Sequence, residues 1–181
     1  MMDSLRDRIA TALVQNEHKQ RFVPYLTLVG ILSDEMVEEC IRQSPIETHL
    51  KNDCIIKVKS GGRKILFILI RIGRVDLLAK LVEWDRAQQD THLDSQLPFE
   101  EISLQKILGS YGAAIDFYDH QWATIPPFFA EDRTHRIYDK RTILPFMSPT
   151  KPLGGGAFGE VSIMTLAGSQ HGFRDLQRRK V

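Results

Sequence analysis

The sequence predicts a mainly α protein in which a helical N-terminal region is followed by a linker and a β-hairpin. Three observations support this fold class. Apolar residues recur at helical spacing over residues 1–125. That spacing stops at the Pro126-Pro127 pair, and a glycine-rich stretch followed by a strand-like alternation begins at Leu153. The predicted organisation is therefore a helical region at 1–125, a linker at 126–142 and a last region at 143–181, with its hairpin at roughly 143–167.

The first 62 residues contain one strong helix start. Ser33 is followed by two acidic residues, which is typical of an N-cap and a first helical turn, and Pro45 ends that helix. Its predicted buried face contains Met36, Val37, Cys40 and Ile41. A helix is also expected after Ser4. The type of segment 22–32 stays open because it holds a proline and a glycine, and segment 46–62 is mixed and includes a Gly-Gly turn.

A pair of helices is predicted from Arg63 onward, with Gly73 as the break between them. No second copy of this pair recurs along the chain, so a repeat solenoid is not supported. Pro98 fits the first turn of a further helix and Gly109 fits its stop. A last helix is expected at about 112–122, which completes the predicted helical region.

Charge changes sign along the chain. Lys plus Arg total 24 and Asp plus Glu total 23, yet residues 1–132 carry a net charge of −5 and residues 133–181 carry +6. The near balance gives no reason to expect nucleic acid or a membrane as a partner. The N-terminus lacks the apolar core of a signal peptide, and the most apolar run, Ile65 to Ile72, is far shorter than the ~20 residues that span a bilayer. A soluble, cytoplasmic protein is expected.

The two cysteines, Cys40 and Cys54, form no CxxC motif and are interpreted as small apolar core residues of a protein from a reducing compartment. No metal site is predicted, because the six histidines show no metal-ligand spacing. Asp116, Asp119 and His120 could gather on one helix face, but a solvated polar face explains them better.

The most informative motif is Leu153-Gly154-Gly155-Gly156-Ala157-Phe158-Gly159-Glu160-Val161, which matches G-x-G-x-x-G-x-V. A dinucleotide-binding fold would need a helix after the glycines and an acidic residue ~20 positions on. Residues 160–166 instead alternate with the period of a strand. A Walker A loop would need Gly-Lys-Ser/Thr, which is absent. A strand–loop–strand arrangement remains, with a flexible glycine-rich linker as the alternative.

These nine residues resemble the glycine-rich loop that covers ATP in protein kinases. The resemblance implies that backbone amides at the tip approach the phosphates, and that the residues flanking the glycines cover the adenine. The residues implied to bind ATP are Leu153, Gly154, Gly155, Gly156, Ala157, Phe158, Gly159 and Val161. The wider order of elements, with Trp, Pro and Phe at 121–129 and Ile-Leu-Pro-Phe at 143–146, is similar to a group of fungal protein kinase-like proteins.

The rest of the kinase machinery is not encoded in these 181 residues. The V-A-x-K lysine is missing, His135-Arg136-Ile137 is not H-R-D, and Asp116-Phe117-Tyr118 is not D-F-G. The chain is therefore expected to be the N-terminal part of a protein kinase of the Ser/Thr type, ending early in its kinase domain (143–181). As a fragment it should be inactive.

In the complete protein, the resemblance implies ATP with Mg as cofactor and a protein as substrate. The helical region would be regulatory or would bind a protein partner. The alternative is a non-catalytic helical adaptor, or protein-interaction module, whose glycine loop is vestigial.

Overall fold

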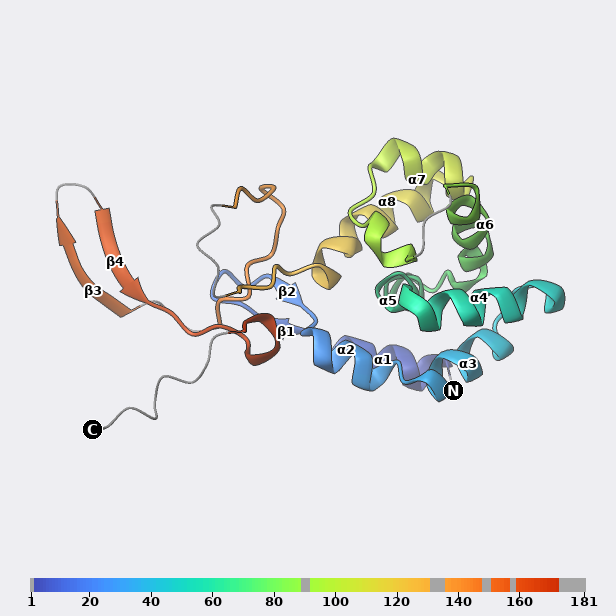
Figure 1. The fold of residues 1–181 in the computed structure, drawn as a ribbon, viewed down its shortest axis with the longest axis horizontal. Coiled ribbons are helices and arrows are strands. Elements are labelled where there is room, and N and C mark those ends of the chain that lie inside the picture. The colour runs from blue at the N-terminus through green and yellow to red at the C-terminus, as the bar shows by residue number, and fades with distance from the viewer. Residues whose placement is uncertain (1, 89–91, 131–135, 148–150, 157–158, 173–181) are drawn as a thin grey trace.

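Helices make up most of the computed structural model, which describes residues 2–88, 92–130, 136–147, 151–156 and 159–172 (Figure 1). The α-helices are α1 (Met2–Ala12), α2 (Tyr25–Ile31), α3 (Asp34–Gln43), α4 (Thr48–Gly61), α5 (Arg63–Ile72), α6 (Leu78–Gln88), α7 (Glu101–Leu108) and α8 (Tyr111–Gln121). The strands are β1 (Val14–Gln15), β2 (Arg21–Phe22), β3 (Lys151–Gly156) and β4 (Gly159–Ile163), and they pair as two antiparallel hairpins, β1–β2 and β3–β4. The predicted mainly α class, with a hairpin after the helices, is confirmed.

Helix α5 lies at the centre of the helical body. Its residues from Ile65 to Ile70 are all fully buried, so this helix is apolar on every side. An α-helix of that kind is stable only when other elements surround it. Helices α1, α2, α4, α6 and α8 pack around it. The main core takes its buried side chains from residues 5–117.

The N-terminal end of α5 is capped by a distant residue, and its C-terminal end by the glycine that follows it. Gly62 precedes the helix without a side-chain cap. Asp94 supplies the cap instead, because its carboxylate accepts the N–H groups of Lys64 and Ile65, each at 3.0 Å. Burial raises the pKa of the Asp94 carboxyl, and these two hydrogen bonds act in the opposite direction. At the other end, Gly73 adopts the left-handed conformation (φ 70°) that ends helices.

Several predicted boundaries are confirmed and others are wrong. Ser33 caps α3, since its Oγ accepts the N–H of Met36 at 3.3 Å. The open segment 22–32 contains α2, and the mixed segment 46–62 forms the long helix α4. The helix expected after Ser4 begins earlier, at Met2.

The helix assigned to Pro98 begins only at Glu101. The side chain of Gln121 explains this difference. Its Oε1 accepts the N–H of Phe99 at 2.8 Å, and its Nε2 donates to the C=O of Phe99 at 3.0 Å. Both backbone groups of Phe99 are therefore satisfied outside a helix, and α7 starts two residues later.

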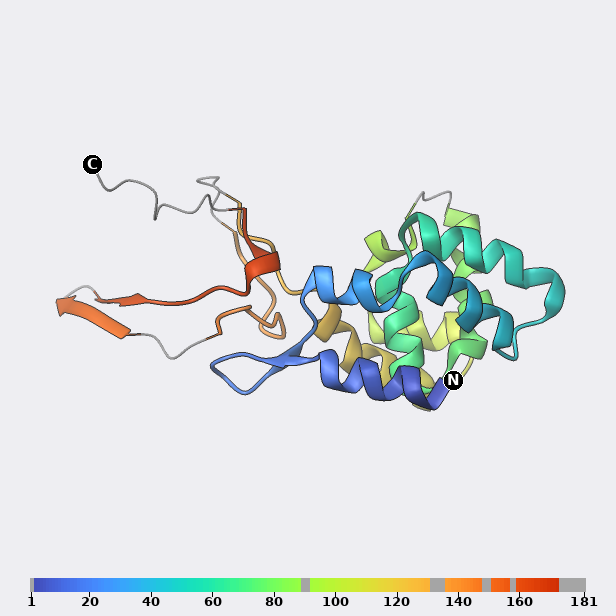
Figure 2. The ribbon, with the colours of Figure 1, turned by 90° about the horizontal axis from the view of Figure 1, so that it is seen from below.

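A second, smaller core joins the start of the chain to residues near its other end. Phe22 on β2 is buried with Ile143 and Ala167. The buried Asn16 amide donates to the C=O of Leu144 at 3.0 Å, and the N–H of Glu17 donates to the C=O of Phe146 at 2.8 Å. From this small core the β3–β4 hairpin projects away from the helical body in both views (Figures 1 and 2).

Candidate functional site

The glycine-rich motif forms an antiparallel hairpin, as the sequence predicts. The paired residues are Lys151 with Ile163, Pro152 with Ser162, Gly154 with Val161, Gly155 with Glu160, and Gly156 with Gly159. Strand β3 ends at the second glycine of G-x-G-x-x-G and β4 begins at the third. The connection therefore falls on the two positions between these glycines. Ala157 and Phe158 occupy those positions and lie outside the described residues.

Gly159 and Gly154 of the hairpin differ in whether the local backbone requires a glycine. Gly159 has φ +144°, a conformation that other residues rarely adopt, so the local backbone itself requires glycine there. A Cβ added at Gly154 would meet no atom within 4 Å. The fold leaves this position open, and a ligand that approaches the backbone closely is one reason for glycine at such a place.

Leu153 lies at an irregularity of the pairing, because the register shifts between Pro152 and Gly154. Its side chain is 65% exposed, and that of Ile163 is 53% exposed. Among the described residues the sheet has only these two strands. The hairpin thus presents apolar side chains that nothing in the described part of the chain covers.

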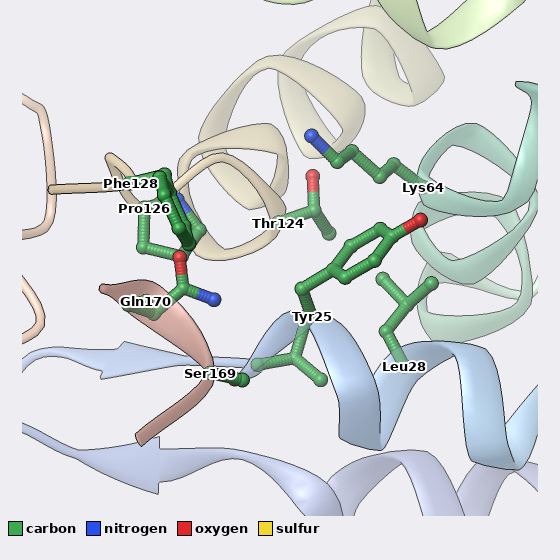
Figure 3. A pocket seen from close by; sticks show the side chains of 9 residues that line it. Tyr25, Leu28, Lys64, Thr124, Pro126, Phe128, Ser169 and Gln170 are labelled. Carbon is green, nitrogen blue, oxygen red and sulfur yellow. The ribbon is translucent and has the colours of Figure 1, made fainter. Parts of the chain in front are cut away.

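A separate cavity lies between α2, the start of α5, the segment after α8 and the turn at 168–170. Its volume is about 280 Å³. It is lined by Val23, Tyr25, Leu28, Lys64, Thr124, Pro126, Phe128, Ser169 and Gln170. Figure 3 shows Tyr25 in the middle of the group, with Phe128 and Pro126 on one side and Lys64 on the other. We refer to it below as the Tyr25 pocket.

Hydrogen bonds fix some polar groups of the Tyr25 pocket and leave others open. Thr124 Oγ1 donates to the C=O of Gln121 at 2.8 Å. With its amide oriented to satisfy both neighbours, Gln170 donates to the C=O of Pro126 at 3.3 Å and accepts the N–H of Tyr25 at 3.0 Å. The Ser169 Oγ is buried and has no hydrogen-bond partner among the described residues.

No residue of the Tyr25 pocket was expected from the sequence to bind a ligand. Its residues come from four segments that only the folded chain brings together, and no motif marks them. One local signal was present: Arg63 and Lys64 place two cations in the first turn of α5, where the helix dipole disfavours positive charge. Arg63 forms an ion pair with Asp34, whereas Lys64 forms no ion pair with a described residue.

Cys40 and Cys54 are both buried in the core, as predicted. His120, suggested as a weak metal candidate, holds the C=O of Asp116 at 2.7 Å through its Nδ1. In the described part of the chain, no three His, Cys, Asp or Glu side chains gather closely enough to hold a metal ion. Similarly, the described helices include none with the length and apolarity that a membrane crossing requires.

The two buried thiols are expected to weaken the fold at high pH. Burial raises the pKa of Cys40 and of Cys54 from 9.0 to about 11. A folded-state pKa above the unfolded value means that their contribution to stability is complete below pH 9 and is lost as the pH rises through 11. The free energy of unfolding, measured by urea denaturation from pH 8 to 11, should therefore fall. In a Cys40→Ala, Cys54→Ala double variant, this fall should be smaller; an identical fall would contradict the assignment.

No protein-family model, no curated protein and no solved structure matches this chain. The geometry of the hairpin and of the Tyr25 pocket is therefore the basis on which a function can be proposed.

Proposed function

We propose that this chain is the N-terminal part of a protein kinase-like polypeptide of the Ser/Thr type, and that the β3–β4 hairpin is its ATP-phosphate-binding loop. The observation that supports this proposal most is the register of the hairpin. The strands meet at Gly156 and Gly159, so the tip falls inside the G-x-G-x-x-G motif. In protein kinases a loop of this sequence, joining two strands, covers the phosphates of ATP.

The exposed apolar side chains of the hairpin agree with this proposal. Leu153 and Ile163 remain uncovered, and an isolated two-stranded hairpin is only marginally stable in water. Further strands of a kinase N-terminal lobe would bury these side chains and extend the sheet. The hairpin would then form the cover of a nucleotide site whose other walls are supplied by the rest of the lobe.

The same proposal predicts no phosphate transfer by these 181 residues alone. Phosphoryl transfer depends on positioning and on charge stabilisation by a lysine, by Mg²⁺ ions and by a catalytic aspartate. The motifs that carry that lysine and aspartate do not occur in the sequence. ATP with Mg²⁺ would be bound in the complete protein, and a protein would be its substrate.

Gly154→Val tests the proposal. The structure offers open space for this side chain, so the fold should be kept, while the valine would stand where the phosphates approach. Binding of ATP·Mg²⁺ is measured by calorimetry in this chain and in a longer polypeptide that continues its reading frame by the length of a kinase domain. We expect binding and phosphate transfer in the longer form, and a loss of affinity of at least tenfold in the Gly154→Val variant.

The matched control is Gly168→Val, because Gly168 also has open space around its Cβ position and lies outside the hairpin. It should leave binding unchanged. Equal binding by the two variants would show that the hairpin does not contact the nucleotide. Absence of binding in the longer polypeptide would also contradict the kinase proposal.

A non-catalytic adaptor is the second candidate, and one observation favours it. Among the described residues, the main core draws its buried side chains from 5–117, and those of the glycine hairpin contribute none. The helical body thus has a core of its own and could serve as a protein-interaction module with a vestigial glycine loop. This alternative predicts that a partner protein binds the helical region and that Gly154→Val changes nothing.

A further inference from the structure

The Tyr25 pocket carries an inference that is independent of the glycine-rich hairpin. We propose that it binds a small organic carboxylate with a flat ring: the ring would lie against Tyr25 and Phe128, and the carboxylate would pair with the ammonium group of Lys64. Neither the kinase proposal nor the adaptor alternative assigns a role to this pocket.

The charge of Lys64 points to an anionic ligand. Its ammonium forms no hydrogen bond or ion pair within the described residues, although the side chain is half-buried and lines the cavity. Asp94 interacts electrostatically with Lys64 but forms no ion pair with it, and its two carboxylate oxygens accept the N–H groups of Lys64 and Ile65. The position in the first turn of α5 adds the unfavourable field of the helix dipole. A bound anion would relieve both effects.

The apolar walls of the Tyr25 pocket suit a flat ring. The rings of Tyr25 and Phe128 are about half exposed, and Leu28 and Pro126 complete an apolar lining between them. Small-molecule sites combine such walls with a few polar groups that fix orientation. Figure 3 shows the Lys64 side chain extending over the pocket from α5, with its ammonium end turned toward Thr124.

The size of the Tyr25 pocket limits the ligand to a small molecule. A volume of about 280 Å³ suits one small ligand and is at the lower limit of ordinary ligand sites. Ser169 lies apart from Lys64 in Figure 3, with Tyr25 between them, and its buried Oγ lacks a partner among the described residues. This hydroxyl group has almost no accessible surface, so the ligand is not expected to contact it. The chemical class is therefore an aromatic carboxylate.

The experiment uses the 181-residue chain with 2-naphthoate as the probe and 2-naphthamide as its uncharged counterpart. Amide shifts in ¹H–¹⁵N spectra are followed during titration. Saturable binding of 2-naphthoate is expected with a dissociation constant on the order of 1 mM or lower. The shifts should centre on residues of the Tyr25 pocket, and 2-naphthamide should bind at least tenfold more weakly.

Four variants assign the binding to the pocket. Lys64→Met keeps the apolar stem but removes the charge, and it should reduce the affinity for 2-naphthoate to that for 2-naphthamide. Lys64→Arg keeps the charge and should preserve the preference for the anion. Phe128→Ala should weaken both probes, since it removes one wall. Lys106→Met, on the exposed side of α7, is the matched control and should bind like the unsubstituted chain.

Three results would overturn the inference: no saturable binding up to ~10 mM, equal binding of the charged and uncharged probes, or unchanged binding by Lys64→Met. Thermal unfolding of each variant shows whether the fold is kept. These outcomes are independent of ATP binding by the hairpin, so either proposal can fail without the other.

Discussion

Replacing Lys57 by methionine is expected to lower the free energy of unfolding by about 3–5 kcal/mol. The Asp85 carboxylate is completely buried, and Lys57 Nζ lies 2.5 Å from its Oδ2. Its Oδ1 has no hydrogen-bond partner among the described residues. Removing the lysine would leave a buried negative charge that neither water nor another described side chain compensates. Urea denaturation with a linear extrapolation measures the change.

Replacing Asp85 and keeping Lys57 should lower the free energy of unfolding by a smaller amount. Lys57 retains about a fifth of its exposed surface, so without Asp85 its ammonium can turn to water. Asp85→Leu should therefore be milder than Lys57→Met, and the Lys57→Met, Asp85→Leu double variant should be close to neutral, because a buried ion pair gains little over apolar packing. A double-mutant cycle gives the coupling energy. A Lys57→Met effect below about 1 kcal/mol would show that the pair is not buried as described.

The second large effect is expected at Ile68, at the centre of α5. Its side chain is fully buried, and truncation to alanine removes buried methyl groups and leaves a cavity, which typically costs about 2–5 kcal/mol. Ile56 in α4 provides the matched control, because the same substitution there affects a side chain that is 67% exposed. Ile56→Ala should change the stability by no more than about 0.5 kcal/mol. Similar losses in both variants would contradict the central position of α5.

Features of the fold that depend on local sequence were predictable. Ser33 and the two acids after it act within a single helical turn, so the start of α3 was predicted correctly. The glycine spacing likewise placed the connection between the two strands correctly, although the strands, Lys151–Gly156 and Gly159–Ile163, are shorter than the predicted hairpin at roughly 143–167. Features that depend on distant partners were not predictable. The capping of α5 by Asp94 and the extended backbone of Phe99 held by Gln121 both require the folded chain.

The two candidate sites also differ in whether the sequence could predict them. The residues of the glycine-rich motif are contiguous, and their sequence alone suggested a phosphate-binding loop. The Tyr25 pocket combines α2, α5, the segment around Thr124 and the turn at Gln170, which are separated by tens of residues. Helix α4 was not predicted because only Cys54, Ile55 and Val58 of its 14 residues are buried, which is too few to give a clear periodic pattern.

The contact between Asn16 and the segment near Leu144 also has a consequence for biosynthesis. These two residues are 128 positions apart, and Phe22 is buried by Ile143 and Ala167 from the same later part of the chain. On the ribosome, the β1–β2 hairpin emerges early but must wait for more than a hundred further residues before its apolar side is covered. The large core from 5–117 can assemble first. Nascent chains stalled before residue 143 should therefore contain a folded helical body and an N-terminal hairpin that lacks its cover from Ile143 and Ala167, detectable as early proteolytic cleavage around residues 14–22.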